Sequence, residues 1–303
     1  MSVAPLTPPA DAVDVAVEPG AARRGAAARA VFFGRPSAAA ASICLLVLIA
    51  LAVFGPVIWN KDPAAVDVAS ALQAPSGAHP MGTDASGRDI LTRFNHGARL
   101  SLTIAPLVVV VGAFFGGLVG LVAGVFRGWS DAVLMRIMDA VLAFPPLILA
   151  MAVTVGMGVG VTSAAVGIML TSIPWYARLL RSDALSIRSR PYIEAARALG
   201  AGRARIVRRH VLPHVVPTLL VQGASVFGYS ILTLAALGFV GLGAQSPTAE
   251  WGTMITEGLQ YAITGQWWIV AFPGLGVFLA VTAANVLADR VQAVLDPRAG
   301  GRA

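Results

Sequence analysis

Long stretches without a charged residue constrain the fold of this chain more than any other feature. Five of them, each 25 to 40 residues long, cover residues 36–60, 100–126, 140–177, 210–249 and 258–288. A helix needs about 20 apolar residues to cross the roughly 30 Å hydrocarbon core of a bilayer. Only 12% of the residues are charged, which is about half the share in an average soluble domain. The sequence therefore predicts an all-α membrane protein.

The length of each stretch sets how many helices it can hold. The stretch 140–177 is long enough for two once its start is extended back through Arg136 and Asp139. A glycine cluster supplies the turn between these two helices: Gly156, Gly158 and Gly160. Asp139 is expected to pair with Arg136, three residues away, near the inner membrane face. The three shorter stretches hold one helix each.

The distribution of arginine sets the topology. Residues 178–209 carry nine arginines and two acids. This segment and the arginine-containing C-terminal tail should both be cytoplasmic, because basic loops stay on that side. An even number of spans must join these two cytoplasmic segments, and 258–288 supplies one of them. The stretch 210–249 therefore holds one helix, about residues 214–241. An outer loop with Glu250 and Glu257 follows it. We expect six transmembrane helices with both termini in the cytoplasm.

These expectations divide the chain into four parts. They are a disordered cytoplasmic tail at 1–36, a first membrane helix with an outer loop at 37–99, a core of five helices at 100–290 and a cytoplasmic tail at 291–303. A cleaved signal peptide is the alternative for the first helix, but its leader is long and its apolar run has full span length. In the outer loop, residues 86–95 place Ile90, Leu91 and Phe94 on one face. This segment could lie flat at the outer membrane surface and contact a partner subunit; the alternative is a packed lid on the bundle.

Two features of the spans bear on how they pack. Glycine recurs at every fourth position of the second span and clears a groove in which a neighbouring backbone can approach closely: Gly112, Gly116, Gly120 and Gly124. We expect these glycines to pack against another helix of the same chain. Prolines lie within the expected helices and should bend them: Pro145, Pro146, Pro174, Pro217 and Pro273.

The composition argues against several activities. The only lysine, Lys61, follows Asn60, whereas a phosphate-binding P-loop needs a lysine directly after a glycine. Any ATP-driven work must therefore be done by a partner. The single cysteine, Cys44, excludes an intrachain disulfide. The formal charge of +7 comes from loops between apolar runs, a pattern of membrane topology and not of nucleic-acid binding.

The basic cytoplasmic segment contains a short predicted helix. Pro191 suits its first turn and Gly200 its C-terminal stop. Small or aliphatic side chains share one face of this helix: Ala195, Ala196 and Leu199. Such a face can sink into a groove of another protein, with Glu194 and Arg197 at its rim.

The segment contains Glu194-Ala195-Ala196, then Gly200 after three further residues. After nine more residues comes the position that is hydrophobic in the pattern, and Leu212-Pro213 follow. This pattern resembles the EAA loop of bacterial ABC importer permeases. In that family the loop forms a coupling helix that docks on an ATPase subunit. The resemblance assigns this docking role to Tyr192, Glu194, Ala195, Ala196, Arg197, Leu199, Gly200, Leu212 and Pro213. His210 departs from the pattern, because the family usually has an aliphatic residue there.

Further motifs resemble the C-type subunit of the dipeptide/oligopeptide permease family. They are Gly82-Thr83-Asp84, Gly87-Arg88-Asp89, residues 97–102, 241–243 and 246–248, Glu250-Trp251-Gly252 and residues 295–298. The resemblance implies the type I ABC importer permease fold in a bacterial cytoplasmic membrane. It also implies a homologous second permease, two ATPase subunits that bind ATP and magnesium, and an extracytoplasmic substrate-binding protein. No cofactor or catalytic residue is expected in this chain itself.

The substrate and its contacts are left open by the sequence. Dipeptides or oligopeptides are the expected cargo, and nickel or a nickel chelate is the alternative within the same machinery. An autonomous channel or secondary transporter would need acids within the membrane and no docking loop, contrary to the pattern here. A membrane enzyme such as a protease would need a catalytic constellation.

Other candidate sites are weaker. His210 and His214 have a helical metal-binding spacing, but Pro213 interrupts that turn. Four outer-loop residues could make a weak metal contact, although a solvated loop is the expectation: His79, His96, Asp84 and Asp89. Hydroxyls within the spans, such as Ser230 and Thr233, have no basic partner, so nothing supports nucleophilic catalysis.

Overall fold

The computed structural model describes residues 31–126 and 128–295. Its helices are α2 (Pro36–Ile58), α3 (Ile90–Phe126), α4 (Trp129–Leu142), α5 (Pro146–Met157), α6 (Val161–Arg188), α7 (Pro191–Ala198), α8 (Arg203–Ile206), α9 (Leu212–Phe239), α10 (Trp251–Ala262) and α11 (Trp268–Leu295). A 3-10 turn η1 (Val68–Ser70) and a π-helical turn (Val207–Val211) complete them. Most of the expected tails at 1–36 and 291–303 lies outside the described residues.

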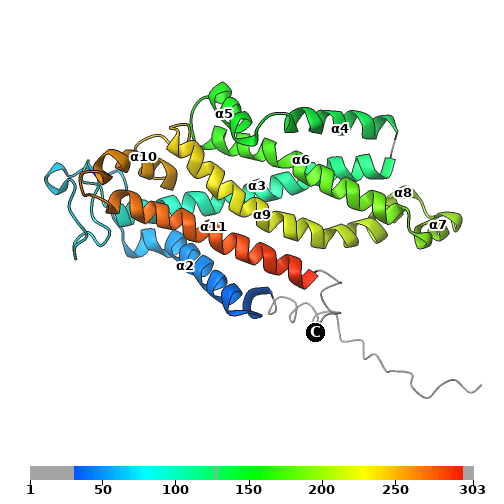
Figure 1. The fold of residues 1–303 in the computed structure, drawn as a ribbon, viewed down its shortest axis with the longest axis horizontal. Coiled ribbons are helices and arrows are strands. Elements are labelled where there is room, and N and C mark those ends of the chain that lie inside the picture. The colour runs from blue at the N-terminus through cyan, green and yellow to red at the C-terminus, as the bar shows by residue number, and fades with distance from the viewer. Residues whose placement is uncertain (1–30, 127, 296–303) are drawn as a thin grey trace, which may run out of the picture.

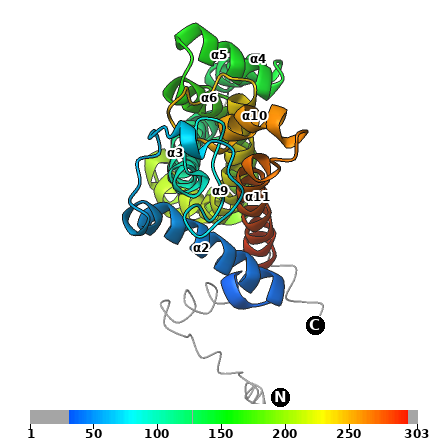
Figure 2. The same ribbon diagram turned by 90° about the vertical axis from the view of Figure 1, so that its left-hand side faces the viewer.

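The helices form an elongated bundle (Figure 1). Helices α2, α3, α6, α9 and α11 run along its length, with α10 and the loop 59–89 at one end and α7 at the other. The end view places α2 and α11 on one side and α4 and α5 on the opposite side (Figure 2). The start of α2 and the end of α11 both lie toward the α7 end of the bundle.

Among the described residues, four helical segments are long and apolar enough to cross a membrane: α2, α3, Ala204–Phe239, which contains α9, and α11. The α4–α5 pair is a fifth candidate, but its two helices are bent by 88°. The predicted pair of helices in 140–177 is therefore present, with its turn at Gly158 and Gly160, and its first member is broken. Pro145 and Pro146 lie at the break, where they remove two backbone donors and stop the helix.

The structure decides two expectations for the end of the bundle that carries α10. Residues 86–95 pack on the bundle and do not form a flat surface helix, because α3 begins at Ile90 and continues for 37 residues, about 55 Å. Ile90 and Phe94 are buried in the core against Trp251. The segment expected to be an outer loop after α9 is mostly the helix α10, and the last span begins at Trp268 instead of Gly258.

The glycine row on α3 packs against α6, as expected, and this is the most extensive helix contact in the bundle. A methyl group on Gly116 or Gly120 would overlap a backbone carbonyl oxygen of α6. On Gly124 it would lie 2.7 Å from the methyl carbon of Ala184. Only glycine lets the two backbones approach this closely. The row therefore serves packing within the chain.

Prolines lie within the long helices, at the positions that the sequence predicts. Pro174 lies within α6, Pro217 within α9 and Pro273 within α11. Pro56 and Pro106 lie within α2 and α3 in the same way. Each removes one backbone donor from its helix. A helix bundle tolerates this loss where neighbouring groups satisfy the freed carbonyl.

We predict that Gly120→Ala lowers the stability of the bundle by about 1–3 kcal/mol, because the added methyl group overpacks the α3–α6 contact. Thermal unfolding of the detergent-solubilised protein measures the effect. Gly156→Ala in α5 is the matched control, since nothing lies within 4 Å of the position of its added methyl group. Equal unfolding temperatures for the two variants would contradict the packing role.

Candidate functional site

The short helix α7 projects from one end of the bundle and is anchored by one buried side chain (Figure 1). Ile193 is fully buried. Its apolar cluster comes from α6, the turn before α9 and the first residues of α9: Leu180, Ala184, Ile187, Ile206, Val211 and Val215. A helix of eight residues is marginal alone in water, so this anchor holds α7 in place.

Both ends of α7 lie where the sequence predicts them. Pro191 is its first residue, where the missing N–H is not needed. After the last turn, Gly200 adopts a φ of +83°, a conformation that glycine tolerates best. The amide of Ala201 donates to the carbonyl of Ala196 at 3.0 Å, and the amide of Gly200 donates to that of Arg197 at 2.9 Å. This pair of bonds closes the helix as a Schellman cap.

The predicted docking face of α7 is open to solvent. Ala195 is exposed, Ala196 is half-buried and Leu199 is 89% exposed. Glu194 and Arg197 are exposed beside them. The side chain of Leu199 therefore presents an apolar surface that no described residue covers.

The remaining predicted docking residues lie at the base of this helix. The rings of Tyr192 and His210 are 5.8 Å apart between centroids, so the histidine that departs from the EAA pattern packs on an aromatic neighbour. Leu212 and Pro213 form the first turn of α9. His214 donates from Nδ1 to the carbonyl of His210 at 2.8 Å.

The two histidines expected in the outer loop form contacts within the chain. Nδ1 of His79 lies 2.8 Å from a carboxylate oxygen of Asp89, and Nδ1 of His96 donates to the carbonyl of Thr92 at 2.9 Å. Over residues 31–126 and 128–295, no three metal-ligating side chains gather at one point. The hydroxyls of Ser230 and Thr233 donate to carbonyls of their own helix.

Ion pairs tie α4 to the inner half of α6. Arg181 donates to both carboxylate oxygens of Asp131, at 2.5 and 2.8 Å. Arg178 donates to Asp139 at 2.5 Å, so the expected pairing of Asp139 with Arg136 was wrong. The two residues are close in sequence, but α4 lies alongside α6 and presents Asp139 to a cation on that helix.

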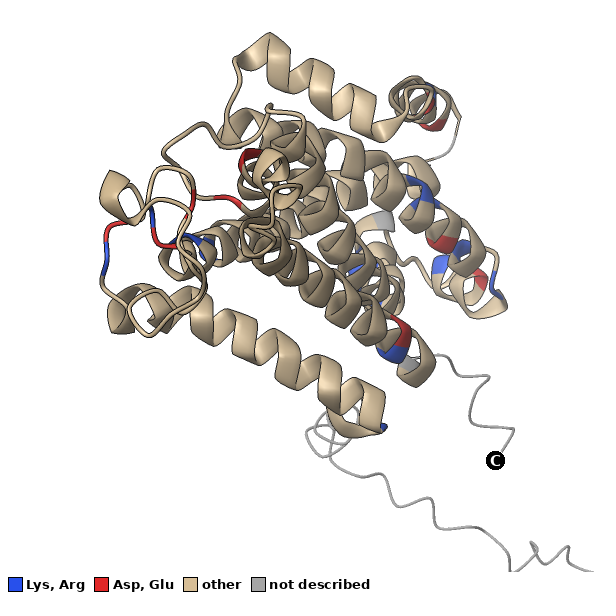
Figure 3. Ribbon diagram, turned by 60° about the vertical axis from the view of Figure 1, so that its left-hand side comes forward, with Lys and Arg blue, Asp and Glu red and all other residues tan. Residues whose placement is uncertain are grey.

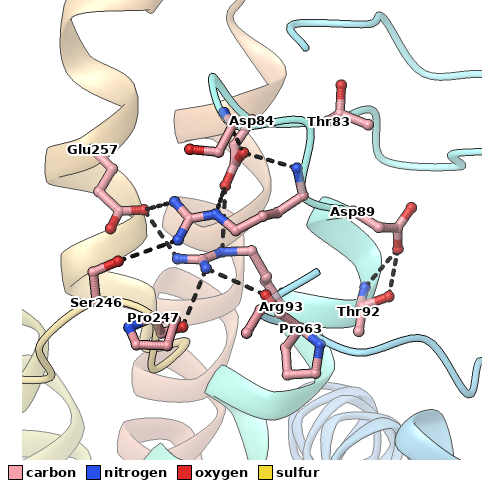
Figure 4. A network of polar contacts seen from close by, with 12 residues as sticks. Pro63, Thr83, Asp84, Asp89, Thr92, Arg93, Ser246, Pro247 and Glu257 are labelled. Carbon is pink, nitrogen blue, oxygen red and sulfur yellow. Dashed lines mark hydrogen bonds and ion pairs between the residues drawn. The ribbon is translucent and has the colours of Figure 1, made fainter. Parts of the chain in front are cut away.

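At the opposite end of the bundle, two buried arginines join three segments of the chain (Figure 4). Arg88 donates to Asp84 at 2.6 Å and to Glu257 of α10 at 3.0 Å. Arg93, only 1% exposed, donates to the same oxygen of Glu257 at 2.9 Å and to the carbonyl of Pro247 at 3.4 Å. We call these four charged side chains, Asp84, Arg88, Arg93 and Glu257, the outer network. It joins the loop before α3, the loop after α9 and α10.

Asp89 connects the same loop to α2 and begins α3. Its carboxylate accepts from the backbone and hydroxyl of Thr92 at 2.9 and 2.7 Å, which caps the helix. It also accepts from the indole of Trp59 at 2.9 Å. Burial alone would raise the pKa of Asp89, but the hydrogen bonds from Thr92, His79 and Trp59 outweigh it and hold the pKa below its ordinary value.

The Glu250-Trp251-Gly252 motif locks α10 against α3 and α9. Glu250 is fully buried and caps α10, accepting from the amides of Gly252 and Thr253 at 2.8 and 2.9 Å. Its burial raises the pKa of its carboxyl group. The Trp251 indole donates to the carbonyl of Phe94 at 3.1 Å. Gly252 lies so close to the backbone of α9 that a methyl group would not fit.

The other motif residues shape the loop before α3. Gly82 and Gly87 have φ values of +77° and +74°, which favour glycine. A side chain on Gly87 would also overlap the carbonyl of Asp67. The carbonyl of Thr83 accepts from the indole of Trp268 at 3.2 Å. The motifs Gly82-Thr83-Asp84, Gly87-Arg88-Asp89 and Glu250-Trp251-Gly252 thus meet in one structural unit at this end of the bundle. Residues 296–298 of the last quoted motif lie outside the described residues.

Sequence reasoning missed two members of the outer network. Arg93 was one charge among several in a flat amphipathic segment, and Glu257 was a solvated loop residue. The sequence did hold one signal: no basic residue lies near Glu257. If that carboxylate is buried, its partner must therefore come from a distant part of the chain.

We predict that Glu257→Gln lowers the stability of the protein by about 3 kcal/mol, because it leaves two buried guanidinium groups sharing one carboxylate. Thermal unfolding in detergent measures the change. Glu194→Gln, the same substitution at an exposed position of α7, should leave stability unaltered. A loss of similar size in both variants would argue against the outer network.

A second prediction concerns pH. Because the pKa of Asp89 is lowered in the folded protein, its stabilising contribution is present at neutral pH and is lost as pH falls below about 4. Asp89→Asn should therefore be less stable at pH 7 and should lose less stability on acidification than the unaltered protein. Asp62→Asn, at an exposed loop carboxylate, serves as control. Parallel pH profiles for the unaltered protein and Asp89→Asn would refute this role.

Comparison with known proteins agrees with this architecture. A family described as binding-protein-dependent transport system inner membrane component matches residues 116–301, more than half of the chain. The N-terminal TM domain of oligopeptide transport permease C matches residues 25–75. A solved structure of the MetNI methionine ABC transporter in an inward-facing conformation has a TM-score of 0.54 at 24% identity, covering 66% of this chain and 95% of that one. That likeness concerns the fold.

Several relatives are similar over most of their length. A probable D,D-dipeptide transport system permease protein of Escherichia coli is 38% identical over 89% of this chain and 90% of that protein. A dipeptide transport system permease protein of the same organism is 40% identical over 88% and 91%. A glutathione transport system permease protein of Pectobacterium atrosepticum is 39% identical over 88% and 89%. The chain belongs to the family of binding-protein-dependent transport system inner membrane components, the multi-pass permeases of bacterial ABC importers.

Proposed function

We propose that this chain forms half of the translocation path of an ATP-driven importer of short peptides. The observation that carries the proposal is α7, a helix with an exposed apolar face and a buried anchor at the end of the bundle. The names of the relatives support a peptide cargo, since they specify D,D-dipeptides, dipeptides and glutathione. Nickel, the alternative cargo, receives no specific support from them.

The proposed assembly contains four further components. A homologous second permease would pair with this chain and close the path. Two ATPase subunits would dock below α7 and bind ATP and magnesium, because this chain has no P-loop. An extracytoplasmic binding protein would deliver the peptide to the opposite end, where the outer network lies.

In this assembly the chain crosses the membrane six times, with α7 and both termini in the cytoplasm. The crossings are α2, α3, the broken pair α4–α5, α6, α9 and α11. The basic residues of the α7 segment support the orientation, because arginine-rich loops remain cytoplasmic. The outer network would then face the side from which substrate arrives.

Motion would pass from the ATPase to the bundle through the anchor of α7. Ile193 packs against α6 and the start of α9, so a push on α7 acts on both helices at once. The energetic link is reciprocal: the nucleotide state biases the bundle, and the bundle state biases nucleotide binding. The outer network would give the far end of α3 a fixed support against which the inner ends could move.

We predict that Ala196→Glu and Gly200→Asp each abolish peptide uptake and leave membrane insertion intact. Ala196→Glu places a charge in the docking face, and Gly200→Asp strains a positive-φ cap. Uptake of labelled dialanine into cells measures transport, and recovery of tagged complex measures docking of the ATPase. Ala74→Glu adds the same charge at an exposed alanine at the other end of the molecule and should transport normally. Normal uptake with normal complex recovery in the two α7 variants would defeat the assignment.

A further inference from the structure

Polar side chains recur along one face of α9. His214, Thr218, Gln222, Ser225 and Tyr229 are spaced by four, four, three and four residues, so they form one stripe along the helix. We call these five residues the α9 stripe. The opposite exposed face of the helix is apolar. It includes Leu220, which is 57% exposed.

The α9 stripe borders two cavities. One, of about 130 Å³, lies near the α7 end between His214 and Thr218 of α9 and residues of α6 that include Asp183. The other, of about 240 Å³, lies farther along α9 and is lined by Gln222, Ser225 and Tyr229. Trp175 of α6 and Pro146, at the bend between α4 and α5, close its far side.

The stripe lies on a helix that is long and apolar enough to span a membrane, yet two of its three middle residues, Gln222 and Tyr229, form no side-chain hydrogen bond with the described residues. The Ser225 hydroxyl donates only a long bond of 3.4 Å to the carbonyl of Val221. Ser225 is exposed, Tyr229 is 39% exposed and Gln222 is half-buried. Within the described part of the chain, no hydrogen bond is formed by the Gln222 amide or the Tyr229 hydroxyl. Polar groups without partners are costly in hydrocarbon and are tolerated where they line water or a polar ligand.

We infer that the α9 stripe lines the path of the substrate, and that Gln222, Ser225 and Tyr229 contact the amide backbone of a short peptide beside Trp175. This inference rests on the proposed function and names the substrate contacts within it. The cavity carries no charged side chain, so it offers neutral donors and acceptors of the kind that pair with amides. An aromatic wall accepts side chains of varied shape. Together these groups suit a ligand with a constant backbone and variable side chains.

Water access to the stripe is tested by thiol labelling in vesicles that hold the complete transporter. In a Cys44→Ser background, Ser225→Cys and Leu220→Cys place a thiol on opposite faces of α9. A charged methanethiosulfonate reagent should modify Ser225→Cys at least about tenfold faster than Leu220→Cys, because thiolates form in water and not in lipid. Dialanine should slow the first reaction and not the second. Equal rates, or no protection by dialanine, would overturn the inference.

Uptake kinetics supply a second test. Tyr229→Phe removes only a hydroxyl and Gln222→Leu only the amide, so each should raise the KM for dialanine roughly fivefold, the loss of one hydrogen bond. Leu220→Ala, on the opposite face of α9, should leave both basal ATP hydrolysis and dialanine transport unchanged. An unchanged KM in both stripe variants would count against the contact. If the unaltered complex imports no dialanine, the peptide assignment fails, whereas fast labelling of Ser225→Cys would still support a water-lined path.

Discussion

The close contact between α3 and α6 is the interaction on which the rest of the molecule depends. Glycines on α3 let the two backbones meet without intervening side chains, so the helices move as one unit. At its outer end α3 carries Arg93 of the outer network. Near its inner end the carbonyl of Val125 accepts from Arg188, the last residue of α6, at 2.8 Å. One closely packed pair of helices therefore connects the outer network to the base of α7.

Charged residues are distributed unevenly along the bundle. Lys, Arg, Asp and Glu gather at the two ends of the bundle and are nearly absent between them (Figure 3). At the outer end, opposite charges are buried and paired, which fixes the geometry of three chain segments. At the inner end, arginines such as Arg197 are exposed and remain available to a partner. The same residue types thus hold the fold at one end and, in the proposed assembly, would form a docking surface at the other.

Local patterns were readable from the sequence because their causes are local. Pro191 and Gly200 delimit α7 through backbone conformation, and the fourfold glycine spacing indicates a groove on any helix. The break between α4 and α5 likewise falls at Pro145 and Pro146. The partner of Asp139, in contrast, depends on where α6 lies, which no local pattern encodes. Glu257 illustrates the limit best: its neighbours in sequence suggest a solvated loop, and only the fold brings two arginines from a segment more than 160 residues away.

The position of the α9 stripe follows from these constraints. Helix α9 begins at the apolar cluster that anchors Ile193 and ends beside α10, which the outer network holds in place. In the proposed assembly, a displacement of α7 would act on a helix whose one end is attached to α7 and whose other end is held by α10. Such a helix would tilt more than it translates, and the groups near its middle, Gln222 and Ser225, would change their distance from α6. The cavity that they border with Trp175 would then widen or narrow with the state of the ATPase, so one motion would serve both coupling and release.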